Sequence, residues 1–274
     1  MIGLFDSGVG GLTVLKEVQK KLPKVKLIYL GDTARTPYGN KSAEVVSAYG
    51  VEAARFLVEK GAKIIVVACN TVSAVGIEAI KKEFPKIKVF DVITPAVERV
   101  VKLKIRNPVK QTPGVATGRS PKSEIKRVGI MGTRALVNSG IYQKLLKEQG
   151  DFEVIARAAP LLVPLVEENW LDKSETKRIV KTYLQPFKQH QIDALVLACT
   201  HYPLLKKIII PRLPKRAILI DPAEETASAL LKNIKADELE IGESEFYVTD
   251  LNEQTQMIAE RWLRQKIKLQ KVSL

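Results

Sequence analysis

Short apolar runs of strand length alternate with longer helical patterns almost from end to end of the chain. The first run is "IGLF" at 2–5, and the last is "EFYVT" at 245–249. The runs between them lie at 26–30, 63–68, 87–92, 127–132, 194–198 and 217–220. Continuous apolar strands separated by helices indicate parallel sheets that are covered by helices on both faces. This alternation predicts an α/β protein with mainly parallel sheets.

Two of the predicted helices carry end signals. A helical pattern over 42–60 stops at Gly61, a residue type that commonly ends a helix. A second helix is expected at "DPAE", with Asp221 as N-cap, Pro222 at the first helical position and Glu224 completing a capping box.

The chain also looks doubled. "IGLFDSGVGG" opens the first half, and "VGIMGTRALVNSG" opens the second with a similar profile of a strand followed by small polar residues. Each half later contains a strand that ends in Ala-Cys, in "IVVACNTVS" and "LVLACTHYP". We therefore expect two similar α/β domains, 1–95 plus 212–274 and 96–211, with the active site in the cleft between them.

The net charge of +14 is concentrated in two places. Residues 102–127 hold eight Lys and Arg against one Glu, and 261–274 hold five with no acid. We interpret these as an extended basic loop between the domains and a solvated tail, since no RNA-binding or helix-turn-helix signature accompanies them. A nucleic-acid partner is not expected, although a binder of nucleic acid or anionic surfaces through these segments stays open as an alternative of another class.

The chain has the features of a cytoplasmic protein. No apolar stretch approaches the about 20 residues that a membrane span needs, and "MIGLFDSG" resembles no signal peptide. Cytoplasmic thiols stay reduced, so the two cysteines are not a disulfide framework.

Polar segments follow several of the predicted strands. They are Asp6-Ser7-Gly8, "GDTARTPYG" at 31–39, Cys69-Asn70-Thr71 and Cys199-Thr200-His201. Ligands of parallel sheets bind beyond the carboxyl ends of the strands. The sequence therefore predicts a small-molecule pocket built from these segments.

Motifs for common cofactors are incomplete or missing from the sequence. "GVGGLT" has Thr13 where the third glycine of a nucleotide fingerprint belongs, and no phosphate-binding loop with Gly-Lys-Ser/Thr occurs. Two cysteines and two histidines lack the paired spacing of a metal site. We expect no cofactor and no metal.

The two cysteines allow three interpretations. Each could be a small buried apolar residue, or Cys199 could pair with His201 as a nucleophile, which leaves Cys69 unexplained. The third reading explains both: two thiols that face one another across a cleft can invert a carbon centre. One removes a proton from one face, and the other delivers a proton to the opposite face. Local charge and helix N-termini can lower the pKa of such thiols toward neutrality.

Five motifs occur in an order that resembles the glutamate racemases of the aspartate/glutamate racemase family. They are "GLFDSGVGGLTVL", "YLGDTARTPYG", "ACNTVSA", "PLVEE" and "LACTHYPLL", spread over nearly the whole chain. The resemblance implies a cofactor-independent enzyme, commonly dimeric, that supplies D-glutamate for bacterial peptidoglycan. The nearest rival is an aspartate racemase or a broader amino-acid racemase with the same pair of thiols.

The resemblance also implies roles for individual residues. Cys69 would remove the α-proton from D-glutamate and Cys199 from L-glutamate, with Asp6 beside the first thiol and His201 and Glu167 beside the second. Asp6 and His201 also count among the residues expected to hold the substrate, together with Ser7, Tyr38, Gly39, Asn70, Thr71, Thr133 and Thr200.

Some assignments stay open from the sequence. Asp6 could instead cap the helix that starts near Gly11, and the sequence does not choose between Glu167 and Glu168. His190 is expected at the surface.

Overall fold

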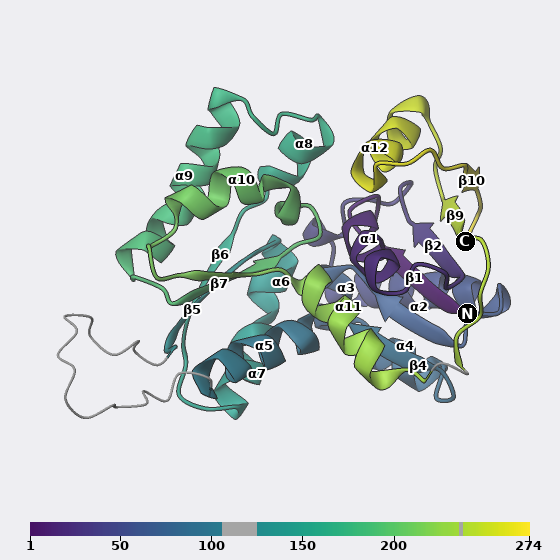
Figure 1. Ribbon diagram of the computed structural model, residues 1–274, viewed down its shortest axis with the longest axis horizontal. Helices are drawn as coiled ribbons and strands as arrows, with labels where there is room; N and C mark the ends of the chain where they lie inside the picture. The colour runs from purple at the N-terminus through teal and green to yellow at the C-terminus, as the bar shows by residue number, and fades with distance from the viewer. Residues whose placement is uncertain (106–124, 236–237) are drawn as a thin grey trace.

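Two sheets of parallel strands organise the chain, each packed between helices (Figure 1). The computed structural model describes residues 1–105, 125–235 and 238–274, so most of the predicted basic segment 102–127 lies outside the described residues. All eight strand pairs in the described ranges are parallel. The predicted α/β class is confirmed.

The first sheet has six strands in the order β10-β9-β2-β1-β3-β4. Their bounds are Ile2–Asp6 (β1), Leu27–Gly31 (β2), Ile64–Val67 (β3), Lys88–Asp91 (β4), Glu245–Val248 (β9) and Leu269–Lys271 (β10). The second sheet has four strands in the order β6-β5-β7-β8. Their bounds are Arg127–Gly132 (β5), Glu153–Ala158 (β6), Ala194–Ala198 (β7) and Ile218–Ile220 (β8).

The two sheets share one strand order. The series β2-β1-β3-β4 in the first sheet corresponds position by position to β6-β5-β7-β8 in the second. The opening strand of each half, β1 or β5, is therefore flanked by the next two strands of its half. The strands that precede the cysteines, β3 and β7, occupy equivalent positions. This common order agrees with the doubling seen in the sequence.

Helices complete the layers around both sheets. Those of the first half and the C-terminal part are Leu12–Lys21 (α1), Ala43–Glu59 (α2), Asn70–Val75 (α3), Ile77–Glu83 (α4), Pro222–Asn233 (α11) and Glu253–Leu263 (α12). The others are Ile93–Ile105 (α5), Arg134–Ser139 (α6), Ile141–Glu148 (α7), Leu162–Glu167 (α8), Ser174–Gln189 (α9) and Lys206–Ile209 (α10). Short 3-10 helices lie at Tyr38–Asn40 (η1), Tyr202–Leu205 (η2) and Ile210–Arg212 (η3).

The strands are apolar on both faces because both faces are covered. Every residue of β1 is buried; Leu4 packs into the cluster that includes α1, α11 and α12, whereas Phe5 packs into the cluster under α2. No helix in the described ranges is long and apolar enough to cross a membrane.

The predicted helix ends are found, with one difference. Ser42 caps α2 through the N–H of Val45, and Gly61 follows the helix at a φ of +92°. Asp221 caps α11 by accepting from the N–H of Ala223 at 2.9 Å. The difference is at Glu224: its carboxylate is 2.5 Å from the ammonium of Lys206, an ion pair in place of the expected capping-box contact.

Two strands were missed by the sequence-based prediction, and a third, β8, was predicted but lies in the second sheet. β6 was missed because it lies at a sheet edge and its residues are only half-buried or exposed, which leaves no continuous apolar run. β10 was missed because it is three residues long and lies in the basic tail. β8 pairs with β7, so the second sheet extends past the boundary that we placed between 211 and 212.

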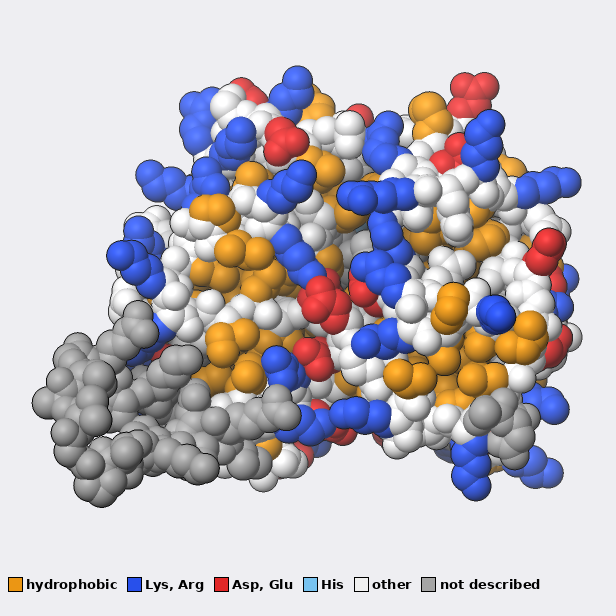
Figure 2. Space-filling model, in the orientation of Figure 1, with side chains coloured by type: hydrophobic (Ala, Val, Ile, Leu, Met, Phe, Trp, Pro, Cys, Tyr) orange, Lys and Arg blue, Asp and Glu red, His pale blue; other side chains and the backbone are white. Residues whose placement is uncertain are grey.

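The basic tail is part of the fold. Residues 261–274 contribute the end of α12 and strand β10, which pairs with β9. On the face shown in Figure 2, Lys and Arg side chains are spread over both halves of the molecule, with Asp and Glu side chains between them.

A buried hydroxyl ties the second sheet together and yields a stability prediction. The Tyr202 hydroxyl is 2.8 Å from the carbonyl oxygen of Ala159 and 3.2 Å from that of Gly132. Tyr202→Phe removes this donor, while each carbonyl keeps a backbone N–H donor, from Ala159 and Leu162, so urea unfolding should show a loss of about 0.5–1.5 kcal/mol. Tyr247→Phe is the matched control: its hydroxyl donates to a partly exposed Glu245, and we expect a change within about 0.5 kcal/mol. Equal effects of both variants would contradict the assignment.

Candidate active site

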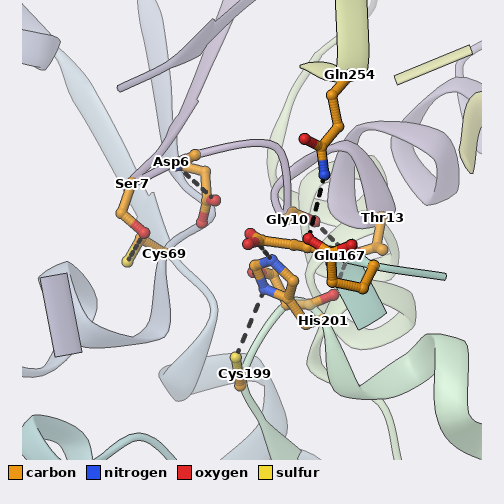
Figure 3. A network of polar contacts seen from close by, with 12 residues as sticks. Asp6, Ser7, Gly10, Thr13, Cys69, Glu167, Cys199, His201 and Gln254 are labelled. Atoms are coloured by element: carbon orange, nitrogen blue, oxygen red, sulfur yellow. Dashed lines mark hydrogen bonds and ion pairs between the residues drawn. The ribbon is translucent and has the colours of Figure 1, made fainter. Parts of the chain in front are cut away.

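A cavity of about 440 Å³ lies at the carboxyl ends of the strands of both sheets. Eleven of the twelve residues that the sequence singled out line it: Ser7, Tyr38, Gly39, Cys69, Asn70, Thr71, Thr133, Glu167, Cys199, Thr200 and His201. The twelfth, Asp6, is buried directly behind Ser7. Figure 3 shows Asp6, Ser7 and Cys69 as one group and Cys199, His201 and Glu167 as another.

Cys69 is the N-cap residue of α3, and Ala68 is the one residue between it and the end of β3. Its thiol donates to Ser7 Oγ at 3.5 Å. Burial and the nearby Asp6 carboxylate raise the pKa of the Cys69 thiol to about 12, against the lowering effect of Ser7 and of the N–H of Val72. The expected lowering by a helix N-terminus is therefore outweighed in this protein by desolvation.

Asp6 is the last residue of β1 and is 1% exposed. Its Oδ2 accepts from the N–H of Gly8 at 3.1 Å. Burial raises the pKa of the Asp6 carboxyl, and the positive charge of His201 and the N–H groups of Gly11, Gly8 and Ser7 oppose that rise. The carboxyl lies near the start of α1, but the N-cap residue there is Gly11 and no side chain caps the helix, so the capping interpretation is wrong. Asp6 lies close to Cys69 instead.

Cys199, His201 and Glu167 form a chain of contacts. Cys199 Sγ is 3.8 Å from His201 Nδ1, and His201 Nε2 is 2.9 Å from Glu167 Oε1. Burial by itself lowers the pKa of His201, but the hydrogen bonds and negative charges of Cys199 and Glu167 outweigh it and raise the pKa to about 10. The imidazole is therefore protonated near neutral pH, between two acidic groups.

The structure distinguishes the two adjacent glutamates and the two histidines. Glu167 contacts His201, whereas Glu168 accepts from Gln254 of α12 at 3.4 Å. His190 lies exposed at the end of α9, as expected.

Small groups bring the two halves together around the cavity. The hydroxyls of Thr71 and Thr133 are 3.0 Å apart, one from each half of the chain. Gly39 approaches Thr133 so closely that a Cβ there would lie 2.9 Å from the threonine Cβ. A Cβ on Gly10 would lie 2.2 Å from Thr200 Oγ1 and 2.6 Å from His201 Cε1. These approaches explain why glycine is needed at both positions.

A buried cluster around Asp32 fixes the position of Tyr38. Its hydroxyl donates to the buried carboxylate of Asp32, which also accepts from Thr249 at 2.7 Å and from Arg35 at 2.6 Å. Burial and the bond to Asp32 raise the pKa of Tyr38 far above its usual value. Tyr38 therefore stays a neutral wall of the cavity.

Several lining residues were missed by sequence reasoning. They are Thr36, Pro37, Asn40, Arg134, Pro160, Leu161, Val163 and Pro164. Thr36 and Pro37 lie inside a loop that the sequence had already marked, and Arg134 follows Thr133 directly. The segment from Pro160 to Pro164 had no comparable signal, because an apolar stretch such as "PLLVP" looks like core.

Trp262 of α12 was also missed. Its ring packs edge-on against the imidazole of His201, with centroids 5.5 Å apart and planes at 88°. The backbone oxygen of Trp262 accepts from Lys16 at 2.6 Å. The C-terminal helix thereby contacts a side chain of the other half of the site, which no local sequence pattern reveals.

Within the ranges that the structure describes, no group of three or more His, Cys, Asp and Glu side chains could hold a metal ion. The fold and the site define a two-sheet α/β protein with one thiol from each half on a shared cavity. The chain belongs to the Asp/Glu/hydantoin racemase family, whose sequence profile matches residues 12–230.

The curated relatives are glutamate racemases. The protein of that name from Aquifex pyrophilus is 44% identical over 259 residues, covering 94% of this chain and 91% of the relative. The crystal structure of glutamate racemase from Francisella tularensis in complex with D-glutamate superposes with a TM-score of 0.84 at 32% identity, covering 99% of this chain and 97% of that one. The Escherichia coli enzyme in complex with L-glutamate and an activator has a TM-score of 0.78 at 25% identity, with 99% and 98% covered.

The contacts of His201 lead to a titration prediction. The chain has two histidines, so His190→Gln leaves His201 as the only imidazole to follow by proton NMR. Its resonances should titrate near pH 10, far above the ordinary value of about 6.5. Because folding raises this pKa, the protonated imidazole stabilises the fold fully below pH about 6.5, and that stabilisation is lost as the pH rises through about 10.

The same experiment has an internal control. Glu167→Gln and Cys199→Ala should each lower the pKa of His201, since both partners favour the protonated form. Glu168→Gln, one residue away, should leave it in place. A His201 midpoint near 6.5 in the parent protein would contradict the geometry.

Proposed function

We propose that this chain interconverts L- and D-glutamate without a cofactor or a metal, by proton transfer between Cys69 and Cys199. The observation that carries the proposal is that the two thiols follow equivalent strands of the repeated fold and line one cavity. A two-base inversion needs one acid–base group on each side of the substrate carbon. The glutamate complexes of related enzymes support the choice of substrate.

The environments of the two thiols differ, which supports one acting as the base and the other as the acid. In the direction from L- to D-glutamate, Cys199 as thiolate removes the α-proton, and the Cys69 thiol delivers a proton to the opposite face. The raised pKa of Cys69 keeps that group protonated in the free protein, ready to act as the acid. In the reverse direction the roles exchange.

Each thiol has charged side chains beside it that can influence proton transfer. The protonated His201, held by Glu167, places a positive charge beside Cys199. Asp6 lies behind Ser7 on the other side, where a carboxyl can influence the proton on Cys69. We assign positioning roles to these three residues.

Short polar groups are suited to hold the substrate without competing as bases. Ser7, Asn70, Thr71, Thr133 and Thr200 present hydroxyl or amide groups to the cavity. We propose that these residues, with Tyr38 and Gly39, bind the carboxylates and the ammonium group of glutamate.

We further propose that the protein acts in the cytoplasm as a homodimer, supplying D-glutamate for peptidoglycan synthesis. The cytoplasm keeps thiols reduced, which two free acid–base cysteines require.

The activity is tested by exchange in deuterium oxide. Cofactor-free protein with L-glutamate should give D-glutamate that carries deuterium at the α-carbon, followed by proton NMR and chiral chromatography. Aspartate in parallel should give neither inversion nor exchange. Turnover of aspartate at a comparable kcat/KM would move the protein to the rival racemase, and no turnover of either would end the proposal.

The thiols are tested by substituting each in turn. Cys69→Ser and Cys199→Ser should each lower racemisation by about 10²–10⁴-fold, because a serine hydroxyl is a far weaker acid–base group. Each variant controls for the other: Cys69→Ser should still exchange the α-proton of L-glutamate, and Cys199→Ser that of D-glutamate. Near-parental racemisation by either variant would refute the two-thiol mechanism.

A further inference from the structure

A second, much smaller cavity lies behind Cys199. Its volume is about 10 Å³, and it shares Asn70, Cys199 and Thr200 with the large cavity. The rest of its wall comes from Thr13, Val14, Val92, Leu197, Pro203, Asp221, Pro222 and Ala223. Cys199 therefore borders the substrate cavity and a separate space that leads toward the start of α11.

The small cavity has the size and the polar groups of a site for one water molecule. A buried water needs about 10–15 Å³ on this measure and two to four polar partners. Asn70 is 3% exposed, and no group in the described ranges donates to its Oδ1. Thr13, Thr200 and Asp221 add further hydroxyl and carboxyl groups to the wall. A water here could donate to the Asn70 and Asp221 oxygens and accept from the Cys199 thiol.

Asp221 connects this cavity with the protein surface. Its side chain is 5% exposed, and its Oδ2 is 2.7 Å from the ammonium of Lys206. Lys206 also contacts Glu224 at 2.5 Å, and the Glu224 side chain is 54% exposed. Burial raises the pKa of Asp221, whereas Lys206 opposes the rise. A carboxyl balanced in this way can take up a proton and release it to solvent beside Lys206.

A two-thiol racemase must restore the protonation states of its thiols after each turnover, in a step that does not involve the substrate. After L-glutamate has become D-glutamate, Cys199 carries a proton and Cys69 has lost one. Before the next molecule of L-glutamate can react, Cys199 must lose its proton and Cys69 must regain one. Both thiols border the open cavity, and Cys69 can regain its proton from water there. On that side Cys199 faces an imidazole that is already protonated and cannot accept its proton, whereas the small cavity gives it a second outlet.

We propose that Asp221, through a water molecule in the small cavity, accepts the proton of Cys199 between turnovers. The proton passes from the thiol to the water while the water gives one to the Asp221 carboxylate, leaving the Cys199 thiolate. Asp221 then releases its proton to solvent beside Lys206, and Cys69 takes one proton from the substrate cavity. One proton leaves the protein and one enters. The inference rests on the two-thiol function proposed above.

Asp221→Asn isolates this role, because asparagine is an equally good N-cap and keeps an oxygen for Lys206. Slowing the return of the free enzyme lowers kcat and KM together and leaves kcat/KM unchanged. We expect kcat to fall by about tenfold or more in both directions, with kcat/KM within about twofold of the parent. Both directions should slow alike, since the return of the free enzyme passes through the same transition state in either sense.

Two further variants keep the test decisive. Val14→Ile fills the small cavity while retaining Asp221 and should give the same pattern, which also covers a failure of Asp221→Asn to fold. Asp193→Asn is the matched control: Asp193 is a buried carboxylate paired with Arg216 at 3.1 Å, away from both cavities, and its substitution should leave kcat and KM unchanged.

The outcomes separate the two proposals. Parental protein without racemisation would overturn the proposed function itself. With racemisation present, an equal fall of kcat and kcat/KM in Asp221→Asn would show a structural effect on the site and overturn the inference. Unchanged kinetics in both Asp221→Asn and Val14→Ile would overturn it as well.

Discussion

Every strand of a parallel sheet ends at the same edge, and in this protein two such edges share one cavity. The cavity takes Ser7 and Cys69 from the ends of β1 and β3, and Thr133 and Cys199 from the ends of β5 and β7. Because both sheets use the same strand order, equivalent residues of the two halves meet across the cavity. The close approach at Gly10 and Gly39 and the contact between Thr71 and Thr133 depend on this arrangement.

The repeat is symmetric in its backbone but not in its electrostatics. Cys69 lies near a carboxyl group, and Cys199 lies near an imidazole that Glu167 keeps protonated. Desolvation raises the pKa of the first thiol, whereas the second has a cation beside it. Two chemically identical groups thus lie in different electrostatic surroundings, which suits a reaction with one acid and one base in each direction.

Sequence reasoning was strongest where buried structure has a local signature. The fully buried strands β1, β3 and β7 have continuous apolar runs, and Asp221 and Pro222 marked the start of α11. It was weakest at sheet edges, where β6 and β10 lack such runs. The apolar wall around Leu161 and the ring of Trp262 were also missed, since an apolar residue in a cavity wall and one in the core look alike in sequence.

By itself the sequence determined the class of fold, the doubling of the chain and the polar segments that end its strands, because hydrophobic periodicity and small polar residues are local properties. Tertiary structure decided which groups touch: Glu167 rather than Glu168 on His201, Trp262 against the imidazole, and Asp221 behind Cys199. Distances and desolvation depend on residues far apart in the chain. The protonation of Cys69 and His201 is therefore a property of the assembled cavity.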